Sequence, residues 1–218
     1  MNCPLCDASA KNLAHSESRE YQLCELCKLI FVPPTFHIPV NEEVARYLEH
    51  ENSLDNEGYV EMFAKKIALV KTHCPPLKTA LDFGCGYEPV LKTLLEKEGM
   101  QTEVYDHNFF PDINANKTYD LVISTETFEH FRNPKEDIQL AANCVSSGGI
   151  LAVMTRFYPI TDGELSKEDF SKWYYKRDPT HILFYTSHTF QWLAENLGFQ
   201  IIFDNQFDFV LLRKPFPS

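Results

Sequence analysis

The sequence predicts an α/β protein with a mostly parallel sheet, a C-terminal antiparallel hairpin and a small metal-binding module at the N-terminus. Strand-like apolar segments alternate with amphipathic helical segments between residues 79 and 155. Two short strand-like segments, 200–204 and 207–213, flank a two-residue turn near the C-terminus, which is typical of a hairpin. Four of the seven cysteines form two C-x-x-C motifs close to the N-terminus.

The length and charge of the chain restrict what it can be. A chain of 218 residues accommodates one α/β domain of ordinary size and a small appendage. The formal net charge is −11 and no long basic run occurs, so a nucleic-acid partner is disfavoured. There is no apolar run long enough to span a bilayer and no signal-peptide pattern, so we expect a cytoplasmic protein with reduced thiols and no membrane partner. Nothing in the sequence predicts an oligomeric state.

The two cysteine motifs are expected to hold one metal ion. Cys3 and Cys6 form the first motif, and Cys24 and Cys27 form the second after 17 intervening residues. Each C-x-x-C turn directs two thiolates at one ion, and two such turns complete a tetrahedral site. This spacing is typical of a zinc ribbon, predicted here over residues 1–33, and four thiolates leave no open position, so the zinc would be structural. The alternative is two reduced pairs or disulfides.

Residues 34–76 are predicted to form a linker and a helical cap. Prolines at positions 33, 34 and 39 interrupt regular structure. Helices are expected over residues 42–51 and 59–73, the second with an apolar stripe on one face. We expect both to be packing helices at one edge of the ligand-binding cleft that the following residues predict.

Residues 79–106 carry the strongest ligand-binding pattern. A strand runs into Gly84 and Gly86, a helix follows from Pro89 to Gly99, and a second strand ends in Asp106. Closely spaced glycines permit positive φ and a close approach of the backbone to a ligand. An acid twenty residues after Gly86 is where a βαβ unit presents a carboxylate to ribose hydroxyls. A glycine turn without a ligand is the alternative.

The sequence Asp82-x-Gly84-x-Gly86 resembles motif I of the class I S-adenosylmethionine-dependent methyltransferases, whose usual form is D-x-G-x-G-x-G. The resemblance implies a Rossmann-like core over residues 77–218. It also implies that S-adenosylmethionine is the cofactor, with Asp82 near its methionine end and Asp106 accepting hydrogen bonds from both ribose hydroxyls.

Two positions separate this pattern from its relatives. Glu88 stands where the methyltransferase family usually has its last glycine, so we expect an altered loop rim. Dinucleotide-binding folds complete G-x-G-x-x-G, and Pro89 occupies the sixth position here. Residues 107–118 are too few for the family's third strand and its helix, and Asp112 is the candidate for the adenine contact. A strand over 119–124, a helix from Pro134 ended by Gly148 and Gly149, and a strand over 150–155 complete the parallel core.

The predicted reaction centre follows the strand at 119–124. Glu126, Glu129 and His130 form an E-x-x-E-H motif, and an acceptor-site insertion over about 156–185 contains His181. The motif resembles that of quinone-pathway and small-RNA methyltransferases, which implies a divalent cation such as magnesium held by these residues. Alternatively the motif caps and packs its turn. His181 is then the expected general base, because an imidazole titrates near neutral pH.

The sequence therefore predicts methyl transfer from S-adenosylmethionine to a small-molecule oxygen, nitrogen or carbon nucleophile. One alternative is 2′-O-methylation of RNA ends, which the E-x-x-E-H motif favours and the net negative charge disfavours. A second alternative is a non-catalytic cofactor-binding module that docks to other proteins through its ribbon.

Overall fold

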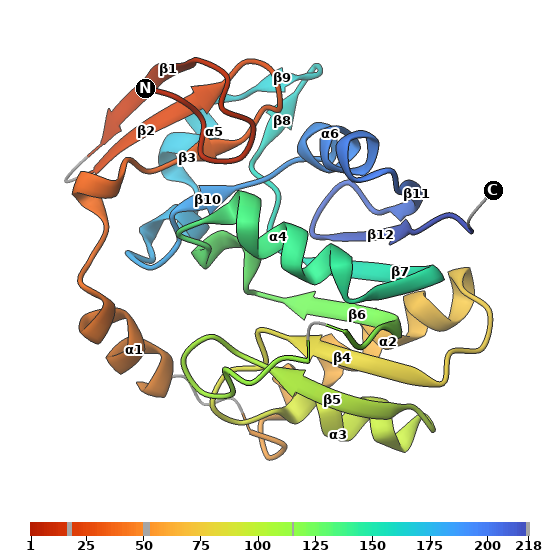
Figure 1. The fold of residues 1–218 in the computed structure, drawn as a ribbon. Coiled ribbons are helices and arrows are strands. Elements are labelled where there is room, and N and C mark those ends of the chain that lie inside the picture. The colour runs from red at the N-terminus through yellow and green to blue at the C-terminus, as the bar shows by residue number, and fades with distance from the viewer. Residues whose placement is uncertain (17–18, 50–52, 115, 217–218) are drawn as a thin grey trace.

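A computed structural model describes residues 1–16, 19–49, 53–114 and 116–216 of the chain. Within these residues a six-stranded central sheet has the order β11-β12-β7-β6-β4-β5, and a four-stranded sheet at the N-terminal end has the order β1-β2-β3-β10. Helices cover both faces of the central sheet (Figure 1). None of the described helices combines the length and apolar composition that a membrane span requires.

The central sheet is mostly parallel. The strands β4 (Thr79–Phe83), β5 (Gln101–Tyr105), β6 (Tyr119–Thr125) and β7 (Val145–Met154) run parallel to one another. The strand β12 (Phe209–Arg213) pairs antiparallel with both β7 and β11 (Gln200–Asp204). This arrangement confirms the predicted parallel core with its C-terminal antiparallel hairpin.

Alternation of side chains along the strands produces two apolar layers. Leu81 and Val122 belong to the layer that packs against α4 (Pro134–Asn143) and α6 (Ser187–Leu197). Ala80 and Leu121 belong to the opposite layer, under α2 (Glu57–His73) and α3 (Val90–Lys97). Because successive strand residues point to opposite faces, helices on both sides bury the whole strand length.

The helical cap begins with the turn η1 (Pro34–Phe36) and α1 (Val40–Glu49). The predicted end of α1 at Glu51 lies outside the described residues. No helix or strand is assigned to the described part of residues 107–118, so the family's third strand is missing as expected.

The prediction that Gly148 and Gly149 end a helix is wrong. The helix α4 stops at Asn143, and both glycines lie inside β7. The pairing of β7 with β6 shifts from Val145 opposite Tyr119 to Ile150 opposite Leu121. Gly148 has φ +77°, so the glycines permit an irregular bulge within the strand.

The N-terminal module, residues 1–33, contains β1 (Ala10–Ser16), β2 (Arg19–Cys24) and β3 (Ile30–Phe31). Its sheet continues into β10 (Leu183–Phe184), which comes from the distant 156–185 insertion. The insertion also forms β8 (Ile160–Thr161), β9 (Glu164–Leu165), α5 (Lys167–Lys172) and η3 (Tyr174–Arg177), and Figure 1 shows it beside the module. Buried residues of the module and of the α4 and α6 layer form one cluster. The module is therefore part of the main core.

Candidate active site and cysteine cluster

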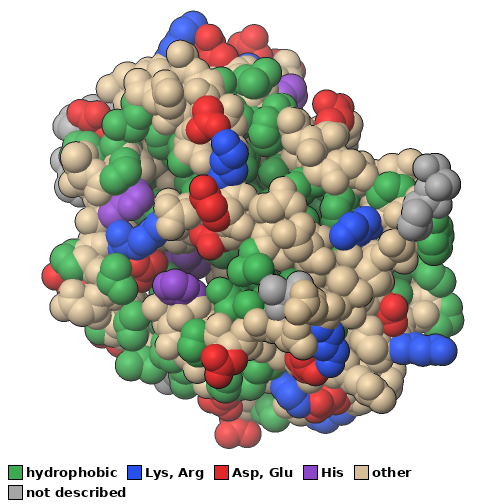
Figure 2. All heavy atoms as spheres, in the orientation of Figure 1, with side chains coloured by type: hydrophobic (Ala, Val, Ile, Leu, Met, Phe, Trp, Pro, Cys, Tyr) green, Lys and Arg blue, Asp and Glu red, His purple; other side chains and the backbone are tan. Residues whose placement is uncertain are grey.

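A cavity of about 770 Å³ lies at the carboxyl ends of β4, β5 and β6. Parallel strands present their following loops at this edge, where ligands bind in open α/β sheets. The cavity is also lined by α1, α2 and residues 174–181. Figure 2 shows histidine side chains where the surface is hollowed, on the side where α1 lies in Figure 1. All four predicted cofactor-binding residues line the cavity, as do Glu126, His130 and His181.

The glycine loop after β4 needs its two glycines for different reasons. Gly84 has φ +86°, and a Cβ there would lie 2.2 Å from Cγ2 of Thr127. Gly86 has φ +69°, and nothing lies within 4 Å of where its Cβ would stand. Gly84 thus permits close packing on the loop after β6, whereas Gly86 presents bare backbone to the cavity.

Asp106, directly after β5, holds this loop in place. Its Oδ2 accepts a hydrogen bond from the Gly86 amide at 3.0 Å. Its Oδ1 accepts from the amides of Asn108 at 2.9 Å and Phe109 at 3.2 Å. A carboxylate offers about four acceptor positions, two on each oxygen. These three bonds leave one position, on Oδ2, for a ligand hydroxyl.

Asp82 is buried beneath the glycine loop, with 1% of its surface exposed. Neither of its carboxylate oxygens has a hydrogen-bond partner among the described residues. Burial, followed by the charge of Asp106, raises the pKa of Asp82 from 3.8 to about 7. A buried carboxyl group without partners is costly. Asp82 is therefore suited to a ligand that supplies a donor or a positive charge.

The E-x-x-E-H motif forms a turn at the end of β6. Glu126 has φ +49°, and η2 (Phe128–His130) follows it. The hydroxyl of Tyr175 lies 2.5 Å from Oε1 of Glu129 and 3.0 Å from Oε2 of Glu126. Tyr175 has one hydroxyl proton, so the second short contact requires a proton on a carboxyl group.

Glu126 and Glu129 differ in their access to the cavity. The exposed surface of Glu126 faces the cavity, whereas Glu129 is fully buried. Desolvation by the surrounding protein raises the pKa of both, and the neighbouring Glu129 raises that of Glu126 further. Oε2 of Glu129 has no partner among the described residues.

His130 and His181 lie side by side, with ring centroids 4.9 Å apart. Nδ1 of His130 lies 3.1 Å from the Thr180 carbonyl, and Nδ1 of His181 lies 2.7 Å from the Tyr175 carbonyl. A carbonyl only accepts, so each Nδ1 carries the proton and each Nε2 remains an acceptor. Burial lowers the pKa of both imidazoles, and the neighbouring His130 lowers that of His181 further. Both rings are neutral near pH 7.

The helix α1 is tied to the cavity rim by residues that sequence reasoning missed. The guanidinium of Arg132 donates to Oε2 of Glu43 through Nε at 3.1 Å and Nη2 at 2.7 Å. The hydroxyl of Tyr47 donates to Oε1 of the same glutamate at 2.7 Å. Arg132 lies two positions after the E-x-x-E-H motif, whereas Glu43 and Tyr47 are far from it in sequence. No pattern in the sequence around any of the three indicates that they contact one another.

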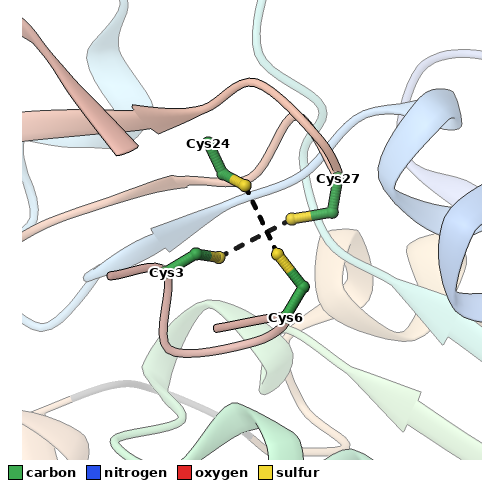
Figure 3. Close-up of side chains that lie close together, drawn as sticks. All are labelled: Cys3, Cys6, Cys24 and Cys27. Carbon is green, nitrogen blue, oxygen red and sulfur yellow. Dashed lines mark hydrogen bonds between the residues drawn. The ribbon is translucent and has the colours of Figure 1, made fainter. Parts of the chain in front are cut away.

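The four N-terminal cysteines converge, as Figure 3 shows. The Sγ atoms of Cys3 and Cys27 are 3.6 Å apart, and those of Cys6 and Cys24 are 3.4 Å apart. These distances exclude disulfides, and every cysteine is free. Tetrahedral zinc with Zn–S bonds of about 2.3 Å places its sulfurs about 3.8 Å apart, so the cluster fits such an ion. Asp7 and Lys28, which follow the two motifs, both have φ near +60° and turn the chain around it.

Two positions singled out in the sequence lie away from the cavity lining. Glu88 and Asp112 are both exposed, and neither is among the residues that line the cavity. His107, Asn108 and Phe109 line it instead, directly after Asp106.

The fold and the glycine loop define an S-adenosylmethionine-dependent methyltransferase. Residues 52–202 match the family model described as a methyltransferase domain, and the chain belongs to that family. No curated protein is significantly similar to the chain in sequence.

Solved structures are similar to the chain at low sequence identity. The plantazolicin methyltransferase BpumL, solved with a monoazolic desmethyl-plantazolicin analogue and S-adenosylhomocysteine, is 12% identical with a TM-score of 0.50. That match covers 81% of this chain and 91% of BpumL. A putative methyltransferase from Bacillus halodurans is 15% identical with a TM-score of 0.47, over 70% of this chain and 98% of the other.

Proposed function

We propose that this methyltransferase acts on a small-molecule oxygen, nitrogen or carbon nucleophile. The observation that carries the proposal is that one cavity joins the glycine loop to the cluster of Glu126, His130 and His181. Its volume of about 770 Å³ is within the range of small-molecule sites, which is about 300–1,000 Å³. A cofactor and a small acceptor therefore fit in one enclosure.

The residues at the glycine end fit S-adenosylmethionine. Gly86 offers open backbone, Asp106 retains one acceptor position for a ribose hydroxyl, and the unpartnered Asp82 suits the positively charged methionine end. When bound, the cofactor supplies a methyl group on a sulfonium, which a nucleophile displaces in line. The protein must then align the acceptor and remove its proton.

We assign these two tasks to different residues. His181 is neutral and offers Nε2 as an acceptor, so it orients the O–H or N–H of the methyl acceptor. Its lowered pKa makes it a weaker base than its residue type suggests. Glu126 faces the cavity and has a raised pKa, so its ionised form is the stronger base. Ionised Glu126 receives the proton, and the hydroxyl of Tyr175 links its carboxyl group to that of Glu129.

A divalent cation at the same place is a second candidate. Glu129, His130 and His181 each offer a ligand atom, and these atoms lie within 4.8 Å of one another. Both imidazoles donate Nδ1–H to a carbonyl, which is how metal-binding histidines are usually oriented. Two imidazoles with a carboxylate suit zinc, manganese or iron better than magnesium, which prefers oxygen ligands. Such an ion would lower the pKa of a coordinated acceptor hydroxyl.

We further propose that the four cysteines bind one structural zinc ion. The support is the sulfur geometry and the two matching turns after Cys6 and Cys27. A reducing compartment such as the cytoplasm keeps such thiols from forming disulfides, and we propose that location for the protein.

The decisive experiment offers the protein labelled S-adenosylmethionine with fractionated metabolites and, separately, with RNA. Label in a small molecule supports the proposal, and label in RNA alone contradicts it. Transfer to neither, with intact cofactor binding, favours a docking module. Removing loosely held metal while the cysteine-bound zinc stays in place separates the two candidates, because only the metal-assisted reaction then stops.

A further inference from the structure

Arg19 lies in the N-terminal module, yet its guanidinium reaches the segment that carries His181. The residue begins β2 and has 9% of its surface exposed. Nη1 donates to the carbonyls of Pro179 at 3.1 Å and His181 at 3.2 Å. Nη2 donates to the carbonyls of Asp178 at 3.1 Å and Lys176. One side chain thus binds four backbone oxygens of residues 176–181.

The two histidines bind the other carbonyls that direct this segment. Nδ1 of His181 donates to Tyr175, and Nδ1 of His130 donates to Thr180. Arg19 binds the carbonyls next to both of these: that of Lys176 follows Tyr175, and those of Pro179 and His181 flank Thr180. When the oxygens of the neighbouring residues are fixed, the peptide planes of Tyr175 and Thr180 can no longer rotate freely. Arg19 therefore sets the direction of the carbonyls that orient both imidazoles.

We propose that Arg19 is a positioning residue for methyl transfer, through which the N-terminal module holds residues 175–181 and aims Nε2 of His130 and His181 into the cavity. The proposal rests on the function proposed above. It gives the N-terminal module a role in the reaction as well as in folding.

The chemistry of this contact requires arginine. A planar guanidinium presents five donors in a fixed fork, whereas a lysine ammonium is a point charge with three donors. A buried charge is stabilised only when its donors are satisfied, and the carbonyls supply that. The hydroxyl of Tyr21, two residues along β2, also contacts the Lys176 carbonyl, at 3.4 Å. The connection continues along β2 to Cys24, one of the clustered cysteines.

The first test measures the segment directly, without any acceptor. Arg19→Gln and Arg19→Lys are compared with the unchanged chain by amide hydrogen exchange, after each is shown to hold the same zinc. Lys11→Gln is the matched control, because Lys11 lies on the same module in an exposed pair with Glu25. We expect faster exchange in residues 175–182 of both Arg19 variants and unchanged exchange in residues 79–86. Unchanged exchange in residues 175–182 would overturn the proposal.

The second test separates positioning from simple stability, using the acceptor found with labelled cofactor. A misplacement of about 1 Å can cost about 100-fold in rate, so Arg19→Gln should lower kcat about 100-fold. Cofactor affinity should stay unchanged, because Gly86 and Asp106 lie outside the segment. Arg19→Lys should recover part of the loss, and it serves alone if Arg19→Gln does not fold.

The outcomes distinguish the two proposals. Faster exchange with unchanged kcat would mean that Arg19 holds the segment without serving the reaction, which overturns the inference. If the unsubstituted protein methylates nothing, the proposed function fails. Arg19 then has no reaction to serve, even where amide hydrogen exchange shows that it holds residues 175–181.

Discussion

Substitution of Asp106 is the sharpest test of the cofactor site, because the structure shows which hydrogen-bond acceptor positions of its carboxylate are already occupied. Three backbone amides occupy three of its acceptor positions, so one remains for a ribose hydroxyl. The sequence predicted bonds to both ribose hydroxyls, and the geometry accommodates one. A hydrogen bond to a charged group contributes about 1.5–3 kcal/mol. Asp106→Ala should therefore weaken S-adenosylmethionine binding roughly 10- to 150-fold, with a further loss if the loop around Gly86 relaxes.

Asp106→Asn should be no milder than Asp106→Ala, although it preserves shape. Placing the amide NH₂ at Oδ2 sets it against the Gly86 amide, and placing it at Oδ1 sets it against the amides of Asn108 and Phe109. Either orientation opposes donor to donor. Isothermal titration calorimetry with the cofactor measures both variants. Asp112→Asn, at an exposed position off the cavity, is the control. Full affinity in Asp106→Asn would refute this reasoning.

Three further predictions follow from the site. His181→Ala should bind cofactor normally and lose most turnover in a labelled-methyl assay, and full activity would remove His181 from the mechanism. The purified protein should contain one zinc per chain by metal analysis, and Cys27→Ser should lose the zinc and unfold at lower temperature; unchanged zinc content in the variant would contradict this. In cofactor-free protein the pKa of Asp82 is raised from 3.8 to about 7, so between these pH values the folded state retains a proton that the unfolded chain releases. The stability that this bound proton contributes is fully present below pH 3.8 and is lost as the pH rises to about 7. Asp82→Asn should flatten denaturant-measured stability across that window, and an unaltered slope would disprove the assignment.

The sequence predicted most of the parallel core because its signals are local. The glycine loop, Asp106 and the strand before Glu126 all show in short windows of apolar and turn residues. The bulge in β7 was misread because Gly148 and Gly149 follow a helix, and glycine is common both after helices and in irregular strands. Only the pairing partner β6 distinguishes the two cases, and that pairing is not visible in a single segment.

The residues proposed for the reaction could be recognised in part from the sequence for the same reason. Glu126, Glu129 and His130 form a contiguous motif, and His181 stands out as a histidine among aromatic and charged residues. Tyr175 binds both glutamates from a distant segment, and nothing in its own neighbourhood specifies that contact. The expectation that His181 titrates near neutral pH also depended on solvent exposure. Burial beside His130 removes that condition.

The N-terminal module looked separable because its cysteines explain its folding by themselves. Its sheet, however, is completed by β10, and β3 and β10 are two-residue strands too short to leave any periodic pattern. Residues 175–181 contain one short 3-10 turn, and Arg19 and the two histidines bind most of their carbonyl oxygens. Such a segment depends on contacts from elsewhere in the fold. A module held together by its own cluster of four cysteines can supply them, which is a physical reason for the module and the insertion to share one sheet.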